Sequence, residues 1–87
     1  MKADIRIVIL QRGWVYVGNF SKEKDGTCVL KNASCIRRWG TSKGLGELVN
    51  GPLQNTVLDA AGTVRFNELT SIAMLDCKGD AWKKHCS

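Results

Sequence analysis

The sequence is poor in the residues that catalysis and metal binding usually require. It contains one histidine, His85, and the four cysteines form no CxxC pair. General acid–base catalysis usually draws on a histidine or on neighbouring carboxylates inside a pocket. His85 and Cys86 are adjacent in sequence, but no third group is in place to orient them as base and nucleophile. The sequence therefore predicts a protein that is not an enzyme and that uses no metal or cofactor.

Long apolar runs are also absent. The first apolar segment, residues 5–10, is shorter than the core of a signal peptide and much shorter than a membrane span. We therefore expect a cytoplasmic protein with no membrane partner. Its 87 residues make a single domain, 1–87, with a small core, so we also expect a homo-oligomer.

The cysteines are spaced too widely along the chain to suggest a metal site. Cys28, Cys35, Cys77 and Cys86 have no second ligand at the short spacing that zinc sites use. If Lys31 and Asn32 form a two-residue turn, Cys28 and Cys35 face each other on flanking strands. In a reducing cytosol they would be two packed thiols.

Alternating apolar residues, interrupted by turn residues, predict a mainly β fold. We expect six short strands, at 5–10, 14–20, 27–30, 34–39, 63–66 and 71–75. One short helix is expected within an insert at about 40–58, between the fourth and fifth strands, with Thr41 or Ser42 as its N-cap. Residues 59–62 are predicted to turn, and the polar tail at about 78–87 to fray. The result is a small bent antiparallel sheet or a partly open barrel.

Between the fourth strand and the helix, the sequence gathers cations, an indole, hydroxyls and glycines. Backbone amides and glycines suit an anion, guanidinium and ammonium groups suit phosphates, and an indole stacks on a base. The predicted ligand-binding residues are Arg37, Arg38, Trp39, Gly40, Thr41, Ser42, Lys43 and Gly44. Trp14 and Tyr16 are candidates for stacking or for an interface. The alternative is that the glycines only turn the chain, the cations are solvated and the aromatic rings pack in the core.

Two stretches resemble the motifs of Sm-like proteins. Residues 13–30 read as Gly-x-x-x-x-Gly-x-Phe, a turn and Val-Leu, and residues 62–66 with Ile72 are similar to the second motif. The resemblance implies an Sm-like small β-barrel. The loops hold Lys24-Asp25-Gly26 and Asn67-Glu68 in place of the Asn and the Arg-Gly pair that Sm proteins use for RNA, so it implies little about RNA binding.

A second resemblance covers most of the chain. The segments Val17-Gly18, Leu30-Lys31-Asn32-Ala33, Arg38-Trp39-Gly40 and Leu45-Gly46-Glu47-Leu48, with the apolar run from Ile72 to Cys77, are similar to a family of small uncharacterised proteins of tailed phages and prophages. This resemblance implies an accessory role for a phage or mobile element, in the cytoplasm of a bacterial host.

Three functions remain open. The first is an oligomeric, non-enzymatic binder of a phosphate-containing nucleotide-type ligand, which would sequester a host signalling nucleotide and so blunt a defence pathway. The second is an Sm-like nucleic-acid-binding protein, which the formal charge of +5 favours. The third is a virion or host-protein interaction module anchored by exposed aromatic residues.

Overall fold

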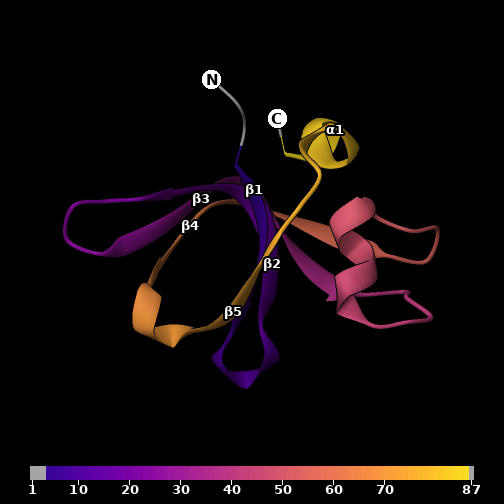
Figure 1. The fold of residues 1–87 in the computed structure, drawn as a ribbon, viewed down its shortest axis with the longest axis horizontal. Helices are drawn as coiled ribbons and strands as arrows, with labels where there is room; N and C mark the ends of the chain where they lie inside the picture. The colour runs from indigo at the N-terminus through magenta and orange to yellow at the C-terminus, as the bar shows by residue number, and fades with distance from the viewer. Residues whose placement is uncertain (1–3, 87) are drawn as a thin grey trace.

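The computed structural model describes residues 4–86, so residues 1–3 and 87 of the predicted domain lie outside the described part. Its centre is one five-stranded antiparallel sheet with the order β4-β3-β2-β1-β5 (Figure 1). The strands are β1 Ile5–Leu10, β2 Val15–Lys22, β3 Thr27–Arg38, β4 Val57–Asn67 and β5 Ser71–Asp76. The two edge strands, β4 and β5, do not pair with each other, so the sheet is not closed into a barrel. The prediction of a mainly β fold built on a bent antiparallel sheet is confirmed.

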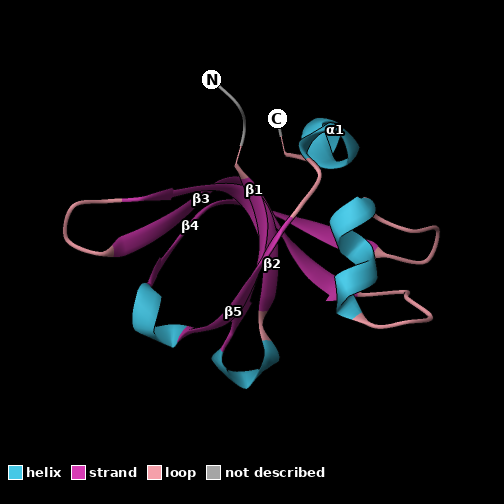
Figure 2. Cartoon of the chain, viewed as in Figure 1, coloured by secondary structure: helices cyan, strands magenta, loops and turns pink. Residues whose placement is uncertain are grey.

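Short helical segments lie in three of the connections between strands and after the last strand, on several sides of the sheet (Figure 2). They are η1 Gln11–Gly13, η2 Leu45–Asn50, η3 Glu68–Thr70, α1 Gly79–Trp82 and η4 Lys83–His85. The helix expected between the fourth and fifth predicted strands is η2, in the connection from β3 to β4. Within residues 4–86, no helix has the length and apolar character needed to cross a membrane.

One long strand, β3, replaces two of the predicted strands. The predicted turn at Lys31 and Asn32 is wrong, because the chain continues through these residues with Asn32 at a φ of 50°. Asparagine tolerates this left-handed conformation, and the pairing of β3 shifts register there on both sides. Opposite the irregularity lies Gly18, where a Cβ atom would stand only 3.0 Å from the Cα atom of Ala33. The turn-like residues therefore bend a continuous strand.

The continuity of β3 also overturns two further predictions. Cys28 and Cys35 do not face each other across a hairpin, because they lie on one strand and pair with Phe66 and Asp59 of β4. Residues 59–62 do not form a turn but lie inside β4, where Gly62 has a φ of 72° and pairs with Ala33. All four cysteines are free thiols.

Bending divides the apolar residues into two clusters. The larger cluster lies where η2 and α1 cover the sheet, and it consists of Ile5, Ile7, Val15, Val17, Ile36, Leu45, Leu48, Trp82 and Cys86. The smaller cluster has a buried centre of Val8, Leu30 and Ala33, and only partly buried residues, including Tyr16 and Phe20, surround it. The second face of the sheet is therefore less completely covered than the first.

The C-terminal segment, which its polar composition suggested would fray, packs against the core as far as Cys86. Trp82 is completely buried, and its indole Nε1–H donates a hydrogen bond to the carbonyl oxygen of Leu48 at 2.7 Å. The backbone N–H of Lys78 donates to the carbonyl oxygen of Val49 at 2.9 Å. The polar composition of this segment concealed the effect of one aromatic residue, which anchors α1 and η4 against η2.

Burial of Cys77 against the larger cluster predicts a loss of stability at alkaline pH. Desolvation raises the pKa of this thiol from 9.0 to about 12. The folded protein therefore holds the thiol proton more tightly than the unfolded chain does. The contribution of Cys77 to the free energy of unfolding is fully present below pH 9 and declines as the pH rises toward 12. We expect the urea midpoint to fall across this range, and to fall less steeply in Cys77→Ala. Identical pH dependence of the two proteins would contradict the assignment.

Candidate functional site

The predicted anion-binding segment leaves β3 as an arch that is held by its own neighbours. The carbonyl oxygen of Trp39 accepts a hydrogen bond from Thr56 Oγ1 at 2.6 Å, and the same hydroxyl accepts one from the N–H of Leu53 at 2.9 Å. Gly40, with a φ of 67°, packs against the backbone of Asn55. The glycine at this position therefore brings two parts of the connection together.

Within the arch, the carboxylate of Glu47 accepts hydrogen bonds from Ser42, whose donors were predicted to bind an external anion. Glu47 Oε1 accepts a hydrogen bond from the N–H of Ser42, and its Oε2 accepts one from Ser42 Oγ, both at 3.3 Å. The predicted N-cap at Thr41 or Ser42 is wrong, because Gly44 precedes η2 and makes no side-chain cap. Glu47 thus supplies an internal negative charge where an external one was expected.

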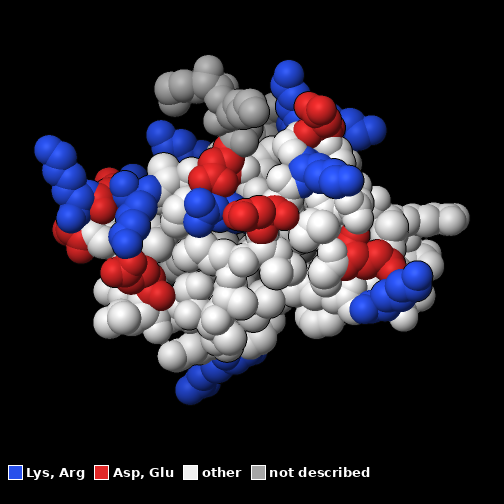
Figure 3. Space-filling model, in the orientation of Figure 1, with Lys and Arg blue, Asp and Glu red and all other residues white. Residues whose placement is uncertain are grey.

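Basic side chains do not form one continuous surface on the face shown in Figure 3, where most of them stand beside acidic ones. Arg65 Nη1 lies 2.9 Å from Glu23 Oε1, Arg6 Nη2 lies 3.0 Å from Asp4 Oδ2, and Lys22 pairs with Glu68. Exposed pairs of this kind contribute little to stability, but they cancel charge locally. The net charge alone therefore does not locate a ligand site.

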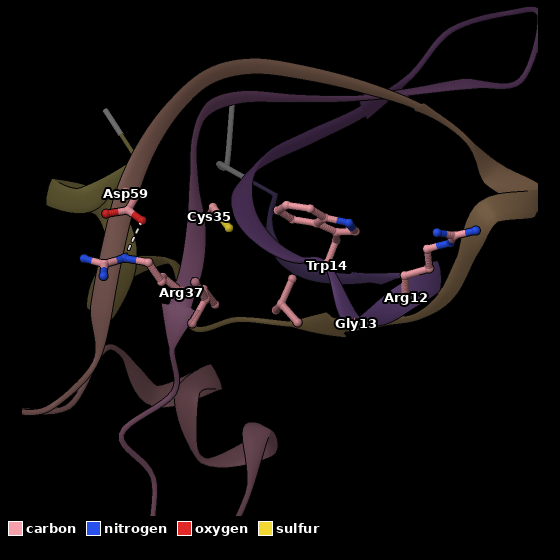
Figure 4. Close-up of a pocket in the computed structure, with 8 residues that line it drawn as sticks. Arg12, Gly13, Trp14, Cys35, Arg37 and Asp59 are labelled. Atoms are coloured by element: carbon pink, nitrogen blue, oxygen red, sulfur yellow. Dashed lines mark hydrogen bonds and ion pairs between the residues drawn. The ribbon is translucent and has the colours of Figure 1, made fainter.

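A groove of about 460 Å³ lies at the end of the sheet where the β1–β2 turn meets β3 and β4 (Figure 4). Its size is within the usual range for small-molecule sites. Register explains how distant residues meet here, since Tyr16 pairs with Cys35 and Cys35 pairs with Asp59 across three neighbouring strands. The lining residues are Arg12, Gly13, Trp14, Val15, Cys35, Ile36, Arg37 and Asp59.

The groove displays an indole ring between two guanidinium groups. Trp14 is 56% exposed, and its ring stacks on that of Tyr16 with centroids 6.4 Å apart and planes 13° apart. Figure 4 shows Trp14 between Arg12 on one side and the pair of Arg37 and Asp59 on the other. Tyr16 belongs to the smaller apolar cluster, so it supports the exposed indole from the sheet.

Asp59 positions the guanidinium of Arg37. Arg37 Nε donates to Asp59 Oδ2 at 2.7 Å, and within residues 4–86 its two Nη groups make no hydrogen bond. The nearby thiol of Cys35 has a raised pKa, chiefly because of burial and also because of the charge on Asp59. The groove therefore offers oriented N–H donors and an aromatic face, whereas its thiol is held neutral.

The structure brings together only part of the predicted site. Arg37 and Trp14 line the groove, and Tyr16 supports Trp14. The other predicted residues do not line it; these are Arg38, Trp39, Gly40, Thr41, Ser42, Lys43 and Gly44. Sequence reasoning missed Arg12, and it favoured a solvated turn position for Asp59 over a place in a site. The only signal for Arg12 was its place beside Gly13 in the first turn, and Asp59 was misplaced in a turn of its own.

Comparison of the sequence with protein-family models gives no match, and comparison with curated proteins gives no significant match. In the described part of the chain, no group of three His, Cys, Asp or Glu side chains is placed to hold a metal ion. What the groove offers chemically is stacking, hydrogen-bond donation and positive charge.

Proposed function

We propose that this protein is a non-enzymatic binding module whose groove takes a nucleotide-type ligand with an aromatic base and a phosphate. The observation that carries the proposal is the half-exposed Trp14 indole, stacked on Tyr16 and placed between Arg12 and Arg37. An aromatic platform beside cations is a common way to bind a base and its phosphate together.

In this proposal the base stacks on the open face of Trp14, and the phosphate accepts hydrogen bonds from Arg37. The guanidinium is suited to this role because Asp59 accepts a hydrogen bond from Nε, so that within residues 4–86 both Nη groups remain available to donate to a phosphate. A phosphate that receives two parallel N–H bonds from a guanidinium is bound more strongly than by a neutral donor. Arg12 adds positive charge from the other side of the indole.

A binding role fits the ionisable groups of the groove better than a catalytic one. The carboxylate of Asp59 is engaged by Arg37, and the raised pKa of Cys35 keeps its thiol uncharged at neutral pH. His85 lies in the C-terminal segment, where its ring meets the edge of Trp82 at a centroid distance of 5.7 Å. Neither a general base nor a nucleophile is therefore prepared beside the indole.

The biological part of the proposal is an accessory role for a phage or mobile element. A homo-oligomer that held a host signalling nucleotide would lower its free concentration and weaken a defence pathway. The resemblance to small tailed-phage proteins supports this role. Native mass spectrometry of protein purified from bacterial cells tests it, with an oligomer carrying a nucleotide-sized adduct as the expected result. A monomer without an adduct would contradict it.

A second candidate is a protein-interaction module that binds a virion component or a host protein. Leu69 is 84% exposed and Ile72 is 66% exposed, in η3 and at the adjoining start of β5. Exposed aliphatic side chains that lie close together are typical of interaction surfaces. Unchanged partner binding in Leu69→Ser/Ile72→Ser would contradict this candidate, and it would leave the groove proposal unaffected.

The stacking role of Trp14 predicts a specific loss of affinity. Replacing Trp14 with alanine should weaken binding of adenosine or guanosine monophosphate by about 1–3 kcal/mol, the usual contribution of one base stacked on an aromatic ring. Isothermal titration calorimetry measures this loss. Trp39→Ala is the matched control, because Trp39 is similarly exposed but lies outside the groove. Equal losses in the two variants would contradict the site.

If Arg37 contacts the phosphate, its substitution should lower the affinity for nucleotides but not the affinity for uncharged nucleosides. Arg37→Gln should weaken binding of the same monophosphates by about 1.5–3 kcal/mol, the usual contribution of a hydrogen bond to a charged group. It should leave binding of the uncharged nucleosides nearly unchanged. Arg38→Gln removes the neighbouring charge outside the groove and is the matched control. If the nucleosides lose as much affinity as the monophosphates, Arg37 does not contact the phosphate.

A further inference from the structure

The C-terminal segment carries positive charge that the groove does not use. Lys78, Lys83 and Lys84 are exposed, and none of the ion pairs among residues 4–86 involves them. Asp80 is the one acidic residue between Lys78 and His85. Figure 3 shows several basic side chains around one acidic side chain in the region where Figure 1 places α1. We call α1 and η4, together with Lys78, the basic cap.

The basic cap is short but firmly attached, which distinguishes it from a loose lysine-rich tail. The buried Trp82 fixes its centre through the bond to Leu48. The N–H of Cys77, just before the cap, donates to the carbonyl oxygen of Ile5 at 3.0 Å, and Asn19 Nδ2 donates to the carbonyl oxygen of Cys86 just after it. Bonds at both ends and in the middle therefore hold the backbone that carries the lysines.

Several exposed lysines on a backbone that is held in place suit a polyanion with regularly spaced charges. Ordering the backbone in advance lowers the entropy lost when several contacts form together. Lysine ammonium groups act as point charges toward phosphates and need no cavity around them. The asparagine that holds Cys86 also donates to the carbonyl oxygen of Lys31 at 3.3 Å, which brings a further exposed lysine of β3 to the edge of the cap.

We infer that the basic cap is a docking surface for the phosphate backbone of nucleic acid, separate from the nucleotide groove. In Figure 1 the cap and the β1–β2 turn, which contributes to the groove, lie at opposite ends of the view. Lys78, Lys83 and Lys84 contact phosphates, Lys31 extends the surface, and Asp80 limits its charge. Binding through such contacts is independent of base sequence and depends steeply on salt.

Fluorescence anisotropy of a labelled DNA duplex, with a labelled single strand in parallel, tests this surface at about 50 to 200 mM salt. In Lys83→Gln/Lys84→Gln we expect weaker binding. The plot of log affinity against log salt should become shallower by about 1.8 for duplex DNA, or 0.9 for each lost contact. The matched control is Lys24→Gln/Arg65→Gln, which removes the same charge from exposed residues of the β2–β3 turn and β4. Its slope should match that of the wild-type protein.

Three outcomes would overturn the inference. They are the absence of binding at the lowest salt, equal slope changes in the two double variants, and binding that Trp14→Ala abolishes. The last would place the polymer in the groove and would support the proposed function at the expense of the cap. Conversely, loss of mononucleotide binding in Trp14→Ala with unchanged DNA binding supports both sites. Slope changes with either probe support the cap, because both probes carry the same backbone chemistry.

Discussion

Trp82→Ala is expected to lower the free energy of unfolding by about 3–5 kcal/mol, the usual cost of removing a large aromatic side chain from a core. Trp82 is fully buried in the larger apolar cluster, and its indole joins α1 to η2 through the carbonyl oxygen of Leu48. Its removal leaves a cavity and an unpaired carbonyl group. Because the domain is small, this loss is a large fraction of its total stability. Urea unfolding followed by circular dichroism measures the change.

Two comparison variants separate the causes of this loss. Trp82→Phe keeps most of the ring but removes the indole N–H, so it should lose less than Trp82→Ala. Trp39→Ala removes a tryptophan that is 42% exposed and should cost much less than either. If Trp39→Ala and Trp82→Ala were equally destabilising, the assignment of Trp82 as the anchor of the C-terminal segment would be wrong.

Gly40→Ala is the second substitution with a large expected effect. Gly40 has a φ of 67°, and the left-handed conformation costs about 1–2 kcal/mol for a residue with a Cβ atom. At this site a Cβ atom would also stand 2.5 Å from the carbonyl oxygen of Asn55 and 2.6 Å from the nitrogen of Thr56. Relief of that overlap requires backbone movement, at a further cost of about 1–3 kcal/mol. Thermal and urea unfolding measure the total.

Gly62→Ala provides the matched control for Gly40→Ala. Gly62 has a similar φ of 72°, but a Cβ atom there would have no neighbour within 4 Å. It should therefore show the cost of the backbone conformation without the cost of the overlap. If the two variants were equally stable, the close approach of Gly40 to residues 55 and 56 would be wrong. That result would also remove the structural explanation for a glycine after Trp39.

The sequence predicts the strands well where the pattern of side chains and the turn agree. Alternation at residues 5–10 and Gly13 in the first turn identify the β1–β2 hairpin, and Asp25-Gly26 identifies the next turn. Prediction fails where turn-forming residues occur inside a strand. Asn32 and Gly62 adopt positive φ at irregularities of β3 and β4, which local sequence does not distinguish from true turns.

Only part of the candidate site was accessible to sequence reasoning, for a related reason. Arg37 and Trp14 were recognised by their chemistry alone. The partnership of Arg37 with Asp59 depends on the pairing of β3 with β4, across 22 positions of sequence. The role of Glu47 was missed in the same way, since its carboxylate reaches back to Ser42 only after η2 forms. The pairing of β3 with β4, and the carboxylates of Asp59 and Glu47 that bond to nearby donors, could not be read from local sequence.

The binding groove is tested most directly by titrating the isotope-labelled protein with guanosine monophosphate. A nitrogen–proton correlation spectrum follows the indole N–H signals of its three tryptophans during the titration. Each tryptophan reports on a different place: Trp14 on the groove, Trp39 on the arch and Trp82 on the core. The proposed function predicts a saturable shift of the Trp14 signal, with the Trp39 and Trp82 signals nearly unchanged. A shift of Trp39 without Trp14, or no shift at all, would contradict it.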